Sequence, residues 1–309
     1  MRLTRRATTT WLTLFLAMLS AAQPVWWMGG SISNGVLRDM SRDQFFCGLL
    51  ILAAVNGLEG PVWASIVTLG WSDALLGLFD VSAVVWIACV AAAGLLYGSR
   101  IREAITIPDA VIGLGILSMA ILPFARLSWL ALAVLSLYML SVAPAQSPRQ
   151  RGALIALAIT GPMLWGPALM EAFGTQILKA DAILVSSVIG TERIGNVFFG
   201  AIGPGGSPTH FAIFQACSSL HGMSIALLAW ITISNALGRA WSARHLAWGL
   251  LAAVSVLLVN VSRMSLIGLF PAYYPTIHGP LGNEIAAWLS LTLVIVISLL
   301  GVGREALKS

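Results

Sequence analysis

The sequence predicts an all-α, polytopic integral membrane protein, and two observations carry this prediction. Of the 309 residues, 58% are hydrophobic and only 9% are charged, with a mean hydropathy of +0.90. A soluble domain carries about 25% charged residues, so this chain has too little charge for a water-facing surface. Several apolar runs also reach the length of about 20 residues that a helix needs to cross a bilayer. We therefore expect lipid to be the solvent for most of the chain.

Eight apolar runs qualify as membrane-spanning helices. They cover residues 11–28, 78–97, 108–124, 126–143, 153–172, 216–236, 246–266 and 284–303. Two shorter runs, 45–55 and 61–71, are separated by a segment that contains Asn56, two glycines and Pro61. We expect these shorter runs to form a re-entrant or interfacial helical pair, with a two-span hairpin as the alternative.

The basic residues orient this layout, with both termini in the cytoplasm. The predicted inner segments contain Arg2, Arg5, Arg6, Arg100, Arg102, Arg149, Arg151, Arg239, Arg244, Arg304 and Lys308. The predicted outer segments contain Arg38, Arg42, Arg126, Lys179, Arg193 and Arg263. The excess of basic residues on the inner side follows the positive-inside rule. Because they are scattered in ones and twos, the net charge of +5 does not indicate a nucleic-acid partner.

The first apolar run has a second interpretation. Three arginines, an apolar stretch over 11–19 and the small residues Ser20, Ala21 and Ala22 also describe a cleavable signal peptide. In either case, the residues after Gln23 are expected outside. A long polar stretch over 174–215 is also expected outside, with an interfacial helix first and a turn at the segment GPGGSPTH.

Motifs of several enzyme classes are absent from the sequence. It contains no HExxH, no GxxxxGK[ST], no GxGxxG and no GxSxG. The only lysines are Lys179 and Lys308, so a Ser/Lys dyad within the membrane is unsupported. Charges in the middle of spans are also few, whereas transporters tend to place ionisable residues there.

Three reactive residues are instead expected at the outer ends of three different spans. Cys217 opens the run 216–236, Arg263 lies near the end of the run 246–266, and His278 precedes the run 284–303. A thiolate is a nucleophile, a histidine can take the thiol proton, and a guanidinium can stabilise a developing oxyanion. The three residues together therefore favour acyl transfer, with no metal and no cofactor.

The segments around these residues resemble the exosortase/archaeosortase family of membrane cysteine transpeptidases and proteases. The resemblance rests on ACSSLH around Cys217, NVSRM around Arg263, the pattern H-x-x-x-G from His278, and LKADAILVSSVIGTERIGNVFF upstream. It covers roughly residues 150–303, so we expect a catalytic transmembrane core over 150–309. Residues 1–149 form an N-terminal transmembrane region that agrees only in being hydrophobic.

The resemblance implies a role for each of the three residues. Cys217 would be the nucleophile, Arg263 its catalytic partner and His278 the base. The substrates would be exported proteins with a C-terminal signal of a short motif, a hydrophobic span and a basic tail. Cleavage would occur at the outer face of the bacterial inner membrane. The family commonly reads Ala-Cys-Ser-Gly-Leu/Ile-Arg, whereas Ser219 and His221 replace the glycine and the arginine here, which indicates a divergent member.

Neighbouring residues leave alternatives open. His221, four residues after Cys217, would share its helical face and could serve as the base or form a Cys-x3-His metal face. Asn260 and Ser218 are possible accessory residues, and Arg263 could instead extend its guanidinium to the lipid headgroups. The alternative function is a non-enzymatic transporter or an assembly component of polysaccharide export. Neither the signal motif, the acceptor nucleophile nor the oligomeric state can be predicted.

Overall fold

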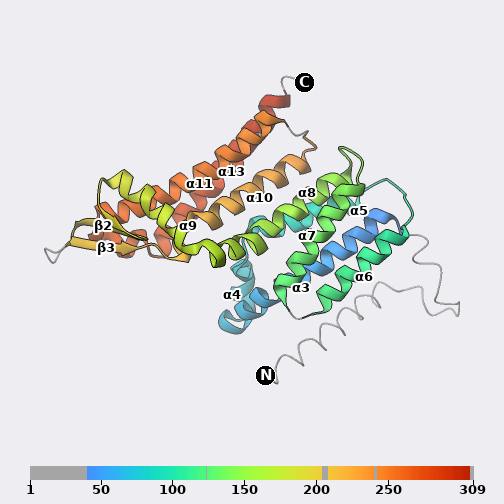
Figure 1. The fold of residues 1–309 in the computed structure, drawn as a ribbon, viewed down its shortest axis with the longest axis horizontal. Helices are drawn as coiled ribbons and strands as arrows, with labels where there is room; N and C mark the ends of the chain where they lie inside the picture. Colours follow the sequence, from blue (N-terminus) through green and yellow to red (C-terminus); the bar gives the residue numbers. More distant parts are fainter. Residues whose placement is uncertain (1–39, 123, 204–207, 240–241, 307–309) are drawn as a thin grey trace.

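The computed structural model describes residues 40–122, 124–203, 208–239 and 242–306 (Figure 1). Most of these residues are helical, which confirms the predicted all-α class. The longer helices are α3 (Arg42–Leu69), α5 (Ala83–Tyr97), α6 (Ile107–Ile121), α7 (Ala125–Val142), α8 (Pro148–Thr160), α9 (Gly166–Ile189), α10 (Ser219–Ala236), α11 (Ala243–Leu269) and α13 (Pro280–Ala306). The shorter ones are α4 (Trp71–Leu76), α12 (Tyr274–Ile277) and the turns η1 (Leu78–Asp80), η2 (Gly161–Trp165), η3 (Gln215–Cys217) and η4 (Pro271–Tyr273).

Five helical segments in the described part of the chain are long and apolar enough to cross a membrane. They are Arg42–Leu69, Ala125–Val142, Pro148–Ile189, Ala243–Leu269 and Pro280–Gly303, and two shorter apolar helices cover Ala83–Tyr97 and Ile107–Ala120. These helices support a membrane protein, while the number of eight spans stays a prediction. The first predicted span, 11–28, and its signal-peptide alternative lie outside the described residues.

Helix α3 corrects the prediction of a re-entrant pair at 45–71. Ser41 caps the helix in a reciprocal capping box with Gln44, and the helix continues without a break to Gly70, where φ is +80°. The expected breakers are accommodated by α7, because Asn56 donates a hydrogen bond of 2.6 Å to Ser128 and Gly57 lies against Trp129. Neighbouring helices can thus stabilise residues that would interrupt an isolated membrane helix.

The structure also places Arg42 at the same end as Arg149, although the two residues were predicted on opposite sides of the membrane. Its guanidinium lies 2.8 Å from Asp109, and its backbone N–H donates to the carbonyl of Glu103. Glu103 in turn accepts a 2.6 Å hydrogen bond from Arg149, which also lowers the pKa of the Glu103 carboxyl. Arg42 and Arg149 therefore share one end of the helices, here called the Arg149 end. The prediction that Arg42 and Arg149 lie on opposite sides was wrong because 42–69 forms one continuous helix rather than a helical pair. Which side of the membrane this end faces stays a prediction.

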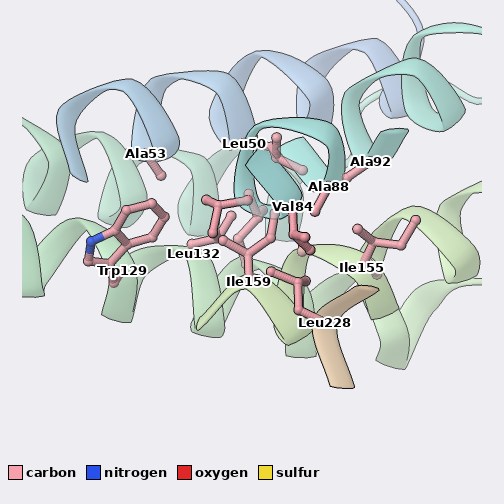
Figure 2. Packing of buried hydrophobic residues seen from close by; sticks show 14 of the residues in the cluster. Leu50, Ala53, Val84, Ala88, Ala92, Trp129, Leu132, Ile155, Ile159 and Leu228 are labelled. Carbon is pink, nitrogen blue, oxygen red and sulfur yellow. The ribbon is translucent and has the colours of Figure 1, made fainter. Parts of the chain in front are cut away.

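The main hydrophobic core lies between helices from both halves of the chain (Figure 2). Leu50 of α3, Leu132 of α7 and Ile159 of α8 meet Leu228 of α10, while small residues such as Ala88 let α5 approach closely. The predicted boundary near residue 150 thus falls within one shared core, and the division into two functional regions stays a prediction.

A single methyl group at Gly57 is expected to disturb this core. A Cβ there would lie 2.6 Å from the indole of Trp129, so Gly57→Ala should destabilise the protein by about 1–3 kcal/mol through overpacking. Gly60→Ala in the same helix is the matched control, because nothing lies within 4 Å of its added Cβ. Thermal unfolding in detergent should show a lower midpoint for Gly57→Ala alone. Equal midpoints for the two variants would contradict the described α3–α7 contact.

A small antiparallel sheet lies beyond the end of α9 and was not predicted from the sequence (Figure 1). Its strands are β1 (Arg193–Ile194), β2 (Val197–Ile202) and β3 (Pro208–Ala212), in the order β1-β2-β3. Phe198 of β2 is fully buried and packs at Gly268 of α11. The predicted turn in GPGGSPTH falls between β2 and β3, although residues 204–207 lie outside the described part. The first part of 174–215, expected as an interfacial helix, instead continues the helix of the predicted span 153–172, because α8 and α9 join through the π-helical turn η2 into one helical segment, Pro148–Ile189.

Candidate active site

Cys217 lies in the last position of η3, directly before helix α10. Ser218 is the N-cap of α10, and its hydroxyl accepts a hydrogen bond from the backbone N–H of Leu220. The thiol therefore lies at the positive end of the helix dipole, which favours an anionic group. Because Cys217 precedes the helix, the prediction that it shares a helical face with His221 was wrong.

Cys217 lies at the end of the bundle opposite to the Arg149 end. The guanidinium of Arg151, close to Arg149 on α8, donates to the carbonyl of Asn235 near the end of α10. Helix α10 has 18 residues, which corresponds to a length of about 27 Å. Cys217 is therefore separated from the Arg149 end by a distance close to the thickness of the bilayer core.

His278 is the residue that the structure brings beside the thiol. Its Nε2 lies 3.4 Å from the Cys217 sulfur, although 61 residues separate them in the sequence. The imidazole stacks on Tyr274, with ring centroids 5.0 Å apart and an angle of 11°, and Tyr274 stacks on Phe211 of β3. Strand β3 and helix α12 thus hold the orientation of the imidazole ring through this stack.

Arg263 is on α11, but its guanidinium makes no hydrogen bond to Cys217 or His278 among the described residues. The side chain is half-buried, and its Nε is buried without a hydrogen-bond partner among the described residues. Asn260, one turn earlier on the same helix, makes the contacts instead. Its amide donates to the carbonyl of Cys217 at 2.8 Å and to the hydroxyl of Ser219 at 3.0 Å.

Asp181 of α9 belongs to this site and was missed from the sequence. Its side chain is buried, and its Oδ2 accepts hydrogen bonds from the Ser218 hydroxyl at 2.9 Å and the Ser219 backbone N–H at 3.1 Å. The available signal was a carboxylate within an otherwise apolar stretch.

Two further histidines, His210 and His221, lie close to Cys217 in the sequence. The side chain of His221 is exposed and makes no hydrogen bond to Cys217, and His210 is an exposed residue of β3. In the described part of the chain, no group of three His, Cys, Asp or Glu residues is arranged to hold a metal ion. The geometry provides a thiol, an imidazole within reach of it and a turn held by two side chains from other helices.

Comparisons with protein-family models, curated proteins and solved structures give no match. The resemblance to the exosortase/archaeosortase family therefore rests on the residues of this chain, and family membership stays a proposal.

Proposed function

We propose that this chain is a membrane-embedded cysteine peptidase or transpeptidase, a divergent member of the exosortase/archaeosortase family. It cleaves C-terminal sorting signals of exported proteins at the outer face of the bacterial inner membrane. The observation that carries this proposal is the distance of 3.4 Å between the Cys217 sulfur and His278 Nε2. Hydrogen-bonded nucleophile and base are the arrangement that covalent catalysis needs, and resting sites are often slightly looser than about 3.2 Å.

The proposed reaction is acyl transfer through a thioester. His278 Nε2 takes the thiol proton of Cys217, and the sulfur attacks the carbonyl carbon of the scissile peptide bond. The C–N bond then breaks, and the imidazolium returns the proton to the departing amine. Water or an acceptor amine attacks the thioester, releasing the thiol together with a free or transferred substrate.

Arg263 is proposed to act on the substrate rather than on the resting thiol. An arginine in an apolar helix is costly unless it has a partner or a task, and Arg263 has no hydrogen bond or ion pair in the described part of the chain. Its position one turn beyond Asn260, which contacts the Cys217 carbonyl, supports a role near the reacting carbonyl. There the guanidinium would stabilise the oxyanion.

The distribution of basic residues supports an outer location for the site. Among the described residues, the Arg149 end carries Arg42, Arg100, Arg102, Arg149, Arg151, Arg239 and Arg244. The Cys217 end carries Arg126, Lys179, Arg193 and Arg263. The positive-inside rule then assigns the Arg149 end to the cytoplasm and the Cys217 end to the outer face. Exported proteins and membrane lipids are the partners that this orientation supports.

Loss of the thiol is expected to leave the sorting signals of exported proteins uncut. Cells lacking the native gene would express the wild-type chain, Cys217→Ala, or the control Cys89→Ala, which removes a half-buried thiol in α5. Mass spectrometry of membrane fractions should detect precursors that retain a C-terminal span and basic tail only with Cys217→Ala. If no precursor accumulates while the variant is present at normal amounts, the chain is not a cysteine peptidase. The alternative function, a non-enzymatic transporter or an assembly component of polysaccharide export, would then replace the proposed peptidase activity.

A further inference from the structure

The turn that carries Cys217 is held by two side chains that do not belong to it. From α9, Asp181 Oδ2 accepts both the Ser218 hydroxyl and the Ser219 N–H. From α11, the Asn260 amide donates to the Cys217 carbonyl and the Ser219 hydroxyl. Residues 217–219 are therefore fixed by an acceptor on one helix and a donor on another.

The contact with Asp181 replaces a bond that the helix cannot make by itself. The Ser219 N–H is among the first N–H groups of α10, which have no carbonyl partner within the helix. Both Ser218 and Ser219 are buried, so these donors would be costly to leave without an acceptor. Removal of the Asp181 oxygen therefore favours a rearrangement of the turn, and Cys217 is the residue directly before it.

We propose that Asp181 is a positioning residue, which holds the Cys217 sulfur beside His278 through Ser218 and Ser219. Its carboxylate contacts neither the sulfur nor the imidazole among the described hydrogen bonds, so it takes no proton in the reaction. What matters is an acceptor oxygen at this position rather than a negative charge. This inference rests on the proposed function, in which the pairing of sulfur and imidazole is the reactive state.

The test measures how fast iodoacetamide alkylates Cys217 at different pH values. It uses the purified full-length protein with Cys47→Ala and Cys89→Ala, so that Cys217 is the only thiol. A sulfur paired with imidazole reacts at neutral pH as a thiolate, whereas an isolated thiol reacts mainly above about pH 8.5. The elements that contact the turn carry further titratable groups, and these are unchanged in every variant. They are His221 on α10, Tyr274 on α12, Glu171 and Lys179 on α9, and Arg244, His245 and Arg263 on α11.

Asp181→Leu should lower the alkylation rate near pH 6.5 by about tenfold or more and leave the rate near pH 9.5 unchanged. Asp181→Asn, which keeps an acceptor oxygen, should restore most of the rate near pH 6.5. Ser218→Ala removes one of the two donors to Asp181 and should cause an intermediate loss of the alkylation rate near pH 6.5. It serves as the milder variant if Asp181→Leu does not fold. Thermal unfolding of each variant separates misfolding from a local change at the turn.

The outcomes distinguish this inference from the proposed function. One outcome is that His278→Ala abolishes the alkylation of Cys217 near pH 6.5, while Asp181→Leu and Ser218→Ala both keep the full rate. The positioning role of Asp181 would then be wrong, and the Cys217–His278 pair would stand. If His278→Ala changes nothing in the parent protein, the sulfur–imidazole pair is wrong, and the inference about Asp181 fails with it. Equal losses in Asp181→Asn and Asp181→Leu would mean that charge, rather than an acceptor oxygen, is required.

Discussion

Replacement of His278 by alanine is expected to lower kcat/KM for cleavage of the exported substrate by about 10²–10⁴, the usual contribution of a general base. The reason is the position of its Nε2, 3.4 Å from the Cys217 sulfur and on a ring held by stacking on Tyr274. Among the described residues, no other side chain is hydrogen-bonded to the Cys217 sulfur, so the variant loses the described partner for proton transfer.

His221→Ala is the matched control for this experiment. Its side chain is exposed on α10 and makes no hydrogen bond to Cys217 among the described residues. We expect its kcat/KM to remain within a few-fold of the wild-type value, since no proton transfer is removed. The reverse ranking of the two variants would transfer the role of base to His221 and show that the resting distance does not identify the reactive partner.

Arg149→Leu is expected to cost about 3–5 kcal/mol of stability, the largest structural effect among these variants. The Arg149 side chain is fully buried, where it forms an ion pair with the equally buried Asp43 and a second one with Glu103. Its guanidinium also lies 5.8 Å from the ring centroid of Phe46. Removing this cation leaves the Asp43 carboxylate uncompensated in a buried site, which is more costly than losing the pair.

Two comparisons make the measurement specific. Arg126→Leu removes the same side chain from an exposed pair with Glu171, so its effect on the free energy of unfolding should be much smaller than that of Arg149→Leu. The double variant Asp43→Leu/Arg149→Leu should recover much of the loss, because it removes both buried charges. Denaturant unfolding in detergent tests both statements. Equal effects of Arg149→Leu and Arg126→Leu would contradict the burial of the Arg149 pair.

The lengths of most helices follow directly from the sequence. The predicted run 126–143 corresponds to Ala125–Val142, and the run 246–266 lies within Ala243–Leu269. An apolar run flanked by polar residues is a one-dimensional signal, because a bilayer requires a helix of a certain length whatever its neighbours are. The same reasoning failed for 45–71. There the continuity of α3 depends on Ser128 and Trp129 of α7, which the local sequence does not contain.

Some features of the candidate site likewise follow from the sequence, whereas others depend on the tertiary structure. Reactive residue types at the ends of predicted spans made Cys217 and His278 candidates, but the sequence left two histidines, His221 and His278, as candidates for the base. The approach of α12 to η3 places His278, rather than His221, beside the thiol, and the start of α10 at Ser219 removes the shared helical face that His221 required.

By itself, therefore, the sequence determined the helical class and the apolar runs long enough for a membrane, and it supplied the candidate residues for the proposed acyl transfer, because these depend on composition and on the period of a helix. The tertiary structure alone decided which imidazole meets the sulfur, that Asp181 and Asn260 hold the turn, and that Arg42 lies with Arg149 at one end of the bundle. These features arise where segments distant in the chain pack together, and contact between distant segments leaves no periodic pattern in a single sequence.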